Sequence, residues 1–292
     1  MSKRLTALVL TATLVSLRPV GAQTRVGIDE GHFNVHTATT TYLPFVEALR
    51  AAGFTVTSTT ERFSAESLAD LDVLVIANAR ASSTGPLEER GKPAFSAAEL
   101  EGIESWVRKG GGLLLVVDHY PVGGANAQLG LRFGIDILNG RTVDRALART
   151  EIAGRVALSA GGSAETNEHL IFESASKTLG AHPILCRAGQ EVNRVATFGG
   201  TSLSTANGAT PLLILTDSAV DYVGADRVPR SAAGRSQALA LQVGRGRVVV
   251  LGEAAALFNI DNPAMDNLNF AVNTVAWLGG QRLICAIPGS RN

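Results

Sequence analysis

The segment from residue 29 to residue 36, DEGHFNVH, places two carboxyl groups, two imidazoles and an amide close together in a chain that has only five histidines. Carboxylates and imidazoles exchange protons near neutral pH and bind metal ions. Asp29 and Glu30 are therefore candidate general bases. His32 and Asn34 are candidate contacts to a ligand.

Polar residues also follow three other apolar segments of the chain. Asn78 ends the run DVLVIANA (72–79), and Glu253 follows the run RVVVL (247–251). Asp118 and His119 follow LLLVV (113–117). Ligands of open α/β sheets bind beyond the carboxyl ends of the strands. We therefore expect a ligand site at one edge of a sheet, lined by Asp29, Glu30, His32, Asn34, Asn78, Asp118, His119 and Glu253. The alternative is that these groups only cap turns and helix ends.

The histidines raise the question of a divalent metal. His32 and His36 are four residues apart and, together with Asp118 and His119, would offer the nitrogen and oxygen ligands that zinc accepts. Because Gly31 precedes them and threonines follow, we expect a loop here rather than a metal-binding helix. Ordinary hydrogen bonding of these rings is therefore the alternative. No other cofactor is expected.

The surrounding elements must bring these residues together. Tyr42, Phe45, Val46 and Leu49 recur with helical spacing, and a Ser96–Glu99 capping box begins a second helix. Apolar strands are expected at 26–28, 54–57, 72–79 and 113–117. Alternation of helices with uniformly apolar strands predicts an α/β fold, flavodoxin-like or Rossmann-like, with a doubly wound and mostly parallel sheet.

The second half of the chain has a different pattern. Residues from about 140 to 208 contain short β-like pieces and many glycines, which indicates an insertion or an antiparallel extension of the sheet. The segments 236–243 and 247–254 flank Gly244-Arg245-Gly246 and predict a hairpin. Asp266 is expected to cap a last helix that buries Leu268 and Val275. Without a linker, residues 23–292 should form a single domain.

The N-terminus reads as a secretory signal peptide, residues 1–22. Lys3 and Arg4 precede an apolar run at 5–17, and small residues at 20–22 offer a cleavage site. The run is too short to span a membrane. We therefore expect export to the periplasm or the medium. Export would permit a disulfide between the only two cysteines, Cys186 and Cys285, and two free thiols are the alternative.

The net charge of the chain indicates which classes of binding partner to expect. The formal net charge is +0 at pH 7, and no basic stretch is interleaved with aromatic residues. A field that attracts nucleic acid or an anionic membrane is therefore not expected. The expected partner is a small polar ligand or another protein.

A family resemblance is carried by FSAAELEGIESWVRKGGGLLLVVDHYP (95–121), and by GEAAALF (252–258) followed by NLNFAVNTVAWL (267–278). These stretches resemble the class I glutamine amidotransferase-like superfamily in its non-amidotransferase branches. Those branches include trehalose-utilisation-type proteins and the domains linked to gliding motility and intraflagellar transport. The resemblance covers most of residues 24–280 and implies the same α/β fold.

One departure from that family bears on activity. Amidotransferases carry a nucleophilic cysteine after the strand that corresponds to 113–117, where this chain has Val-Asp-His-Tyr. Without the thiolate, glutaminase chemistry is unavailable. A serine nucleophile elbow is also missing from the sequence. The favoured expectation is a domain that binds a small polar ligand, such as a sugar, or a partner. A metal-assisted hydrolase with Asp29 or Glu30 as base and His119 as acid is the first alternative, and a purely structural domain is the second.

Overall fold

A nine-stranded sheet forms the centre of the computed structural model, which describes residues 23–149, 169–205, 208–258 and 260–285. The expected signal peptide lies outside the described residues. The strand order is β2-β1-β3-β4-β15-β14-β10-β5, with β11 paired to β14. The strands are β1 (Arg25–Asp29), β2 (Thr55–Thr59), β3 (Val73–Ala77), β4 (Gly112–Val116), β5 (Ile135–Ile137), β10 (Leu203–Thr205), β11 (Thr210–Ile214), β14 (Ser236–Val243) and β15 (Gly246–Leu251).

Half of this sheet is parallel. Strands β2, β1, β3, β4 and β15 pair side by side in parallel, so their carboxyl ends share one edge. Strand β14 then pairs antiparallel with β15 through the expected hairpin, and β10, β11 and β5 continue in antiparallel pairing. The prediction of a mostly parallel α/β sheet with an antiparallel extension is confirmed.

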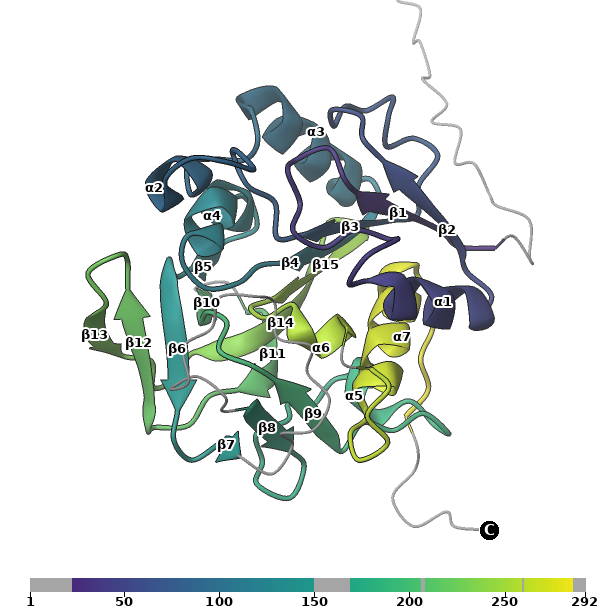
Figure 1. Ribbon diagram of the computed structural model, residues 1–292. Coiled ribbons are helices and arrows are strands. Elements are labelled where there is room, and N and C mark those ends of the chain that lie inside the picture. Colours follow the sequence, from purple (N-terminus) through teal and green to yellow (C-terminus); the bar gives the residue numbers. More distant parts are fainter. Residues whose placement is uncertain (1–22, 150–168, 206–207, 259, 286–292) are drawn as a thin grey trace, which may run out of the picture.

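Helices cover both faces of the sheet (Figure 1). Side chains alternate between the faces of a strand. Val73 and Val75 of β3 accordingly pack in one apolar cluster with Phe45, while Leu74 and Ile76 pack in the other with α3. The helices are α1 (Leu43–Ala51), α2 (Leu87–Arg90), α3 (Ala97–Arg108), α4 (Val122–Arg132), α5 (Pro183–Cys186), α6 (Ala255–Phe258) and α7 (Asn267–Leu278). The first cluster takes in α1, α6 and α7, and the second takes in α3 and α4.

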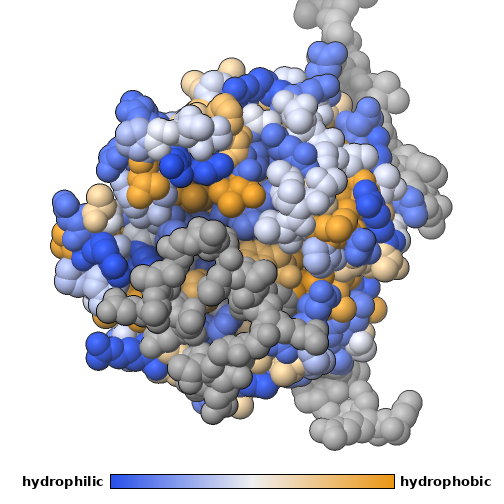
Figure 2. Space-filling view, viewed as in Figure 1, coloured by the Kyte–Doolittle hydropathy of each residue, from blue (hydrophilic) through white to orange (hydrophobic). Residues whose placement is uncertain are grey.

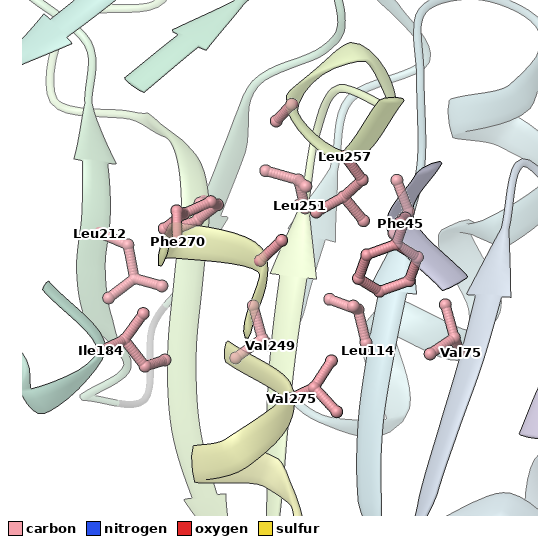
Figure 3. Packing of buried hydrophobic residues seen from close by; sticks show 14 of the residues in the cluster. Phe45, Val75, Leu114, Ile184, Leu212, Val249, Leu251, Leu257, Phe270 and Val275 are labelled. Atoms are coloured by element: carbon pink, nitrogen blue, oxygen red, sulfur yellow. The ribbon is translucent and has the colours of Figure 1, made fainter. Parts of the chain in front are cut away.

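The larger cluster joins elements that are distant in sequence. Figure 3 shows Phe45 of α1 beside Leu114 of β4 and Leu257 of α6, with Val249 of β15 close to Val275 of α7. All five side chains are fully or almost fully buried. Burial of each such side chain stabilises the fold by about 1.5–3 kcal/mol. The apolar character of the strands therefore anchors the sheet whose edge carries the polar residues.

Two small antiparallel sheets flank the central one (Figure 1). One has the order β13-β12-β6 and the other β7-β8-β9. Their strands are β6 (Gly140–Asp144), β7 (Ala148–Arg149), β8 (His169–Glu173), β9 (Arg194–Thr197), β12 (Ala219–Val223) and β13 (Val228–Ser231). The segment expected to be an insertion or extension, residues 140–208, thus contributes β6 to β10, and its residues 150–168 lie outside the described residues.

The last helix differs from the sequence expectation at its start. Asp266 occupies the N-cap position of α7 without a capping hydrogen bond from its side chain, which accepts instead from the backbone N–H groups of Asn193 and Arg194 at β9. Leu268, expected in the core, is 44% exposed. The carboxylate is therefore used to dock the start of β9 onto the helix.

A disulfide joins Cys186 at the end of α5 to Cys285, 99 residues away in sequence. Of the two alternatives left open by the sequence, the structure has the bridge. Replacing both cysteines by alanine is expected to lower the free energy of unfolding by about 2–5 kcal/mol, because the bridge restricts the unfolded chain over a long loop. Urea unfolding of both proteins, with and without dithiothreitol, measures the loss.

The alanine variant provides the control for that experiment. Reductant should destabilise the wild type to about the level of the variant and should leave the variant unchanged. Equal stability of the wild type in oxidising and reducing buffer would contradict the prediction.

The surface of the protein has both apolar and hydrophilic residues (Figure 2). Figure 2 shows a strip of apolar residues near the middle of one face, with hydrophilic residues around it. Within the described ranges, every helix is too short or too polar to cross a lipid bilayer.

Candidate functional site

The polar residues that follow the parallel strands gather at one edge of the sheet. Strands β1, β3, β4 and β15 are consecutive neighbours in the sheet. Backbone bonds continue past their ends: Asn78 N–H donates to the Val116 carbonyl at 2.9 Å, and Val117 N–H donates to the Leu251 carbonyl at 2.8 Å. The residues that follow β3, β4 and β15 therefore stand side by side, as the parallel sheet predicts.

Asp29 and His32 belong to a buried network rather than to an open surface. The His32 ring nitrogens face two carboxylates: Nδ1 lies 2.9 Å from Asp29 Oδ1, and Nε2 lies 2.9 Å from Glu99 Oε1. The His32 ring also stacks on Phe63 with centroids 4.6 Å apart. Both nitrogens of His32 and the carboxylate of Asp29 are thus engaged inside the protein.

The electrostatics of this network are strong. Burial by itself lowers the pKa of His32, but the hydrogen bonds and negative charges of Asp29 and Glu99 outweigh it and raise the pKa above its ordinary 6.5. Burial likewise tends to raise the pKa of Glu99, yet hydrogen bonds from Ser96 and His32 lower it to about 2. The two carboxyl groups that face His32 therefore favour the protonated form of its imidazole.

Glu30 and Asn34 also make internal contacts. Glu30 Oε1 accepts from Ala38 N–H at 2.9 Å and from Ser58 Oγ at 2.8 Å. Asn34 Nδ2 donates to Asp29 Oδ2 at 2.9 Å and to the Ala77 carbonyl at 3.1 Å. These contacts fasten the loop after β1 to the ends of β2 and β3.

Asn78 and Asp118 form the next part of the edge. Asn78 Nδ2 donates to Asp118 Oδ2 at 3.1 Å, and Asp118 Oδ1 accepts from His119 N–H at 2.7 Å. Asn78 has a left-handed backbone with φ of 49°, which asparagine tolerates better than most residues. Its Oδ1 is buried and has no hydrogen-bond partner within the described part of the chain.

Glu253 lies just beyond β15 and is 3% exposed. Its Oε1 accepts from Ala255 N–H at 2.8 Å, whereas its buried Oε2 has no partner among the described residues. Burial, and then the negative charge of Asp118, raise the pKa of Glu253 well above 4.5, and Arg141 acts in the opposite direction. The alternative predicted from the sequence, that Glu253 only caps a helix end, therefore explains Oε1 but not Oε2.

The rings of His36 and Tyr42, in the segment before α1, lie close enough to Asp118 to be affected by its charge. His36 stacks on Tyr42 with centroids 5.0 Å apart, and its Nδ1 lies 2.5 Å from Thr41 Oγ1. Burial lowers the pKa of His36, while the charge of Asp118 acts to raise it. The fully buried Tyr42 has a pKa raised well above 10 by burial, followed by the charges of Asp118 and Glu253.

The four residues considered for a metal do not form one group, although His119 Nε2 lies 3.7 Å from Asp118 Oδ1. His32 packs on Phe63 in one apolar layer, and His36 packs on Tyr42 in the other. His119 is exposed, and its Nδ1 lies 2.9 Å from the Tyr120 carbonyl. Over the described residues, no three His, Cys, Asp or Glu side chains are grouped to hold a metal ion.

A second wall of the site was not predicted from the sequence. Gly200 has φ of 56°, and a Cβ on it would lie 2.3 Å from the Gly252 carbonyl oxygen and 2.8 Å from Glu253 Cβ. Only glycine therefore lets this loop pack against Glu253. The preceding Phe198 ring contacts the buried His169 ring, with centroids 5.6 Å apart, and carries the Arg141 guanidinium 5.8 Å from its centroid.

These partners come from β6, β8 and the loop after β9, in the region where the sequence has no clear periodicity. No spacing signal links them to Glu253. The sequence predicted Glu99 as part of a capping box, which the structure confirms, but not as the partner of His32.

Comparison with known proteins gives the fold. No family model matches the sequence, and neither does any curated protein. Among solved structures, the N-terminal domain of mmIFT52 is 16% identical with a TM-score of 0.62, over 89% of this chain and 100% of that one. The cytoplasmic protein STM1381 from Salmonella typhimurium is 14% identical with a TM-score of 0.52, over 88% and 99% of the two chains.

A ThuA-like protein from Bacteroides uniformis is 13% identical over 90% of this chain and 94% of its own, with a TM-score of 0.47. At these identities the likenesses show an α/β fold that this chain shares with the first two proteins over nearly its whole length.

Proposed function

We propose that the chain is an amidotransferase-like domain without the nucleophilic cysteine, which binds a small polar ligand such as a sugar at the rim site. The rim site is defined here as Asn78, Asp118 and Glu253. Three neighbouring strands deliver these three polar side chains to one edge of the sheet.

The observation that carries this proposal is the pair of buried oxygens without partners among the described residues, Asn78 Oδ1 and Glu253 Oε2. A buried polar atom left without a hydrogen bond costs about 1–3 kcal/mol, and native proteins rarely leave one so. A hydroxyl group both donates and accepts, so a hydroxyl-rich ligand can satisfy both atoms.

The hydrolase alternative has less support. Of its expected bases, Asp29 has both carboxylate oxygens in internal hydrogen bonds, and Glu30 has its Oε1 in two such bonds. The structural alternative explains Asp29, Glu30, His32 and Asn34 well, but it leaves the two rim oxygens without a role. Export remains part of the proposal, and the Cys186–Cys285 disulfide is compatible with it.

Thermal-shift measurement against neutral sugars and polyols tests the proposal. A ligand at one hundred times its Kd should stabilise the wild type by about 2.7 kcal/mol. Asp118→Ala should lose this response, because it removes the acceptor beside Asn78. Asp70→Ala is the matched control, since Asp70 is an exposed acid that pairs with Arg25 at the start of β1.

The control variant should respond like the wild type. A panel in which no compound stabilises the wild type, or in which all three proteins respond equally, would contradict ligand binding at the rim site.

A further inference from the structure

Glu253 is the carboxyl group of the rim site that is buried next to apolar residues. It lies between β15 and α6, where Ala254, Ala255 and Leu257 are all at most 3% exposed. A carboxylate in such surroundings is costly unless it is paired, and neutralisation by a proton is the usual outcome.

The two oxygens of Glu253 have different environments. Oε1 accepts a hydrogen bond from Ala255 N–H at 2.8 Å, and Oε2 is buried without a partner among the described residues. A neutral carboxylic acid has one accepting carbonyl oxygen and one donating hydroxyl. Since Oε1 already acts as an acceptor, we place the proton of the neutral form on Oε2, which is then a donor without an acceptor among the described residues.

Two charged groups act on Glu253 from the elements around it. Asp118 after β4 disfavours its ionisation, and Arg141 of β6 favours it. Tyr42 before α1 stays uncharged, because burial raises the pKa of its hydroxyl. Burial and Asp118 outweigh Arg141 and the backbone N–H groups of Ala254 and Ala255, so the pKa of Glu253 is raised.

We propose that Glu253 is kept as a neutral carboxylic acid, and that its Oε2–H is the hydrogen-bond donor that the rim site offers to an acceptor oxygen of the ligand. The proposal rests on the proposed function for the ligand. Loss of the proton would replace this donor by a second negative charge near Asp118. Ligand binding should therefore weaken as the pH rises, by about tenfold for each pH unit above the pKa of Glu253.

Infrared spectroscopy of the ligand-free protein tests the protonation state directly. The spectrum of the wild type minus that of Glu253→Gln should contain the carbonyl band of a protonated carboxyl group at pH 7. The band should vanish at higher pH. Glu66→Gln is the matched control, because Glu66 is exposed and should show no such band. Absence of the band in the Glu253 difference spectrum at pH 7 would overturn the proposal.

Stability provides a second readout. A carboxyl group with a raised pKa in the folded state contributes stability that is fully present below pH 4.5 and is lost as the pH rises through the raised value. The Tm of Glu253→Gln minus that of the wild type should therefore increase from pH 4.5 upward. Should that variant not fold, Asp118→Asn serves instead, because removing the neighbouring charge should lower the pH at which the infrared band disappears. A band whose pH dependence is unchanged by Asp118→Asn would count against the proposal.

Binding of glucose, mannose and myo-inositol, each measured by calorimetry from pH 6 to pH 9, tests the donor role. Glu253→Gln keeps a donor and should bind independently of pH, whereas Glu253→Ala should lose binding. Equal binding by the wild type and Glu253→Ala would overturn the donor role and leave the proposed function standing. No binding of any probe to the wild type would count against the proposed function, while the infrared band would still decide whether Glu253 is neutral.

Discussion

Replacing His32 by leucine is expected to lower the free energy of unfolding by about 3–5 kcal/mol. The side chain is buried between Asp29 and Glu99, and its loss leaves two carboxylates without the positive charge that both of them face. Urea unfolding of the two proteins at pH 6 measures the difference.

The pH dependence of that difference follows from the two shifted pKa values. His32 has a raised pKa, so its contribution is complete below pH 6.5 and is lost as the pH rises through the folded-state value. Glu99 has a pKa lowered to about 2, so its contribution is complete above pH 4.5 and is lost as the pH falls towards 2. The stability difference between the wild type and His32→Leu should therefore be largest between pH 4.5 and pH 6.5.

The matched control is His119→Leu, which changes an exposed histidine on the same edge of the sheet. Its effect should stay within about 0.5 kcal/mol. A loss below about 1 kcal/mol in His32→Leu, or a stability difference that does not change between pH 6 and pH 9, would contradict the network described here.

Phe45→Ala should be the most damaging single change in the apolar core, at about 3–5 kcal/mol. Phe45 is fully buried, and Figure 3 shows it where α1 meets β4 and α6. Its removal leaves a cavity at the junction of three elements, which the surroundings can fill only in part. Chemical unfolding measures the cost.

The control for Phe45 is Leu131→Ala on α4, since Leu131 is 63% exposed and should change stability little. Similar losses for Phe45→Ala and Leu131→Ala would show that this junction is not the packed core that we describe.

The parallel half of the fold could be predicted because its central strands, β3 and β4, are buried on both faces and are therefore apolar throughout. Every residue of the two strands that end at Ala77 and Val116 is apolar or glycine, and every one is buried. The edge that carries Asn78, Asp118 and Glu253 followed from the same pattern, because parallel strands end together. The capping box of Ser96 and Glu99 could also be predicted, because its two residues are only three positions apart, and the structure confirms it.

Long-range pairing could not be predicted in this way. His32 meets Glu99 across 67 residues, and nothing in either local sequence marks the other as its partner. Asp266 has the residue type of a helix cap, yet its carboxylate bonds to the backbone of Asn193 and Arg194. The wall formed by Phe198 and Gly200 depends on a loop from the antiparallel region, where periodicity is weak.

Calorimetric titration of the wild type, Asp118→Ala and Asp70→Ala, with the neutral sugar that gives the largest thermal shift, tests the central claim most directly. We expect one binding site in the wild type and in Asp70→Ala. Binding should be at least about tenfold weaker in Asp118→Ala, which corresponds to the loss of one hydrogen bond to a charged group. Equal affinity in all three proteins would contradict the assignment of the ligand to the rim site.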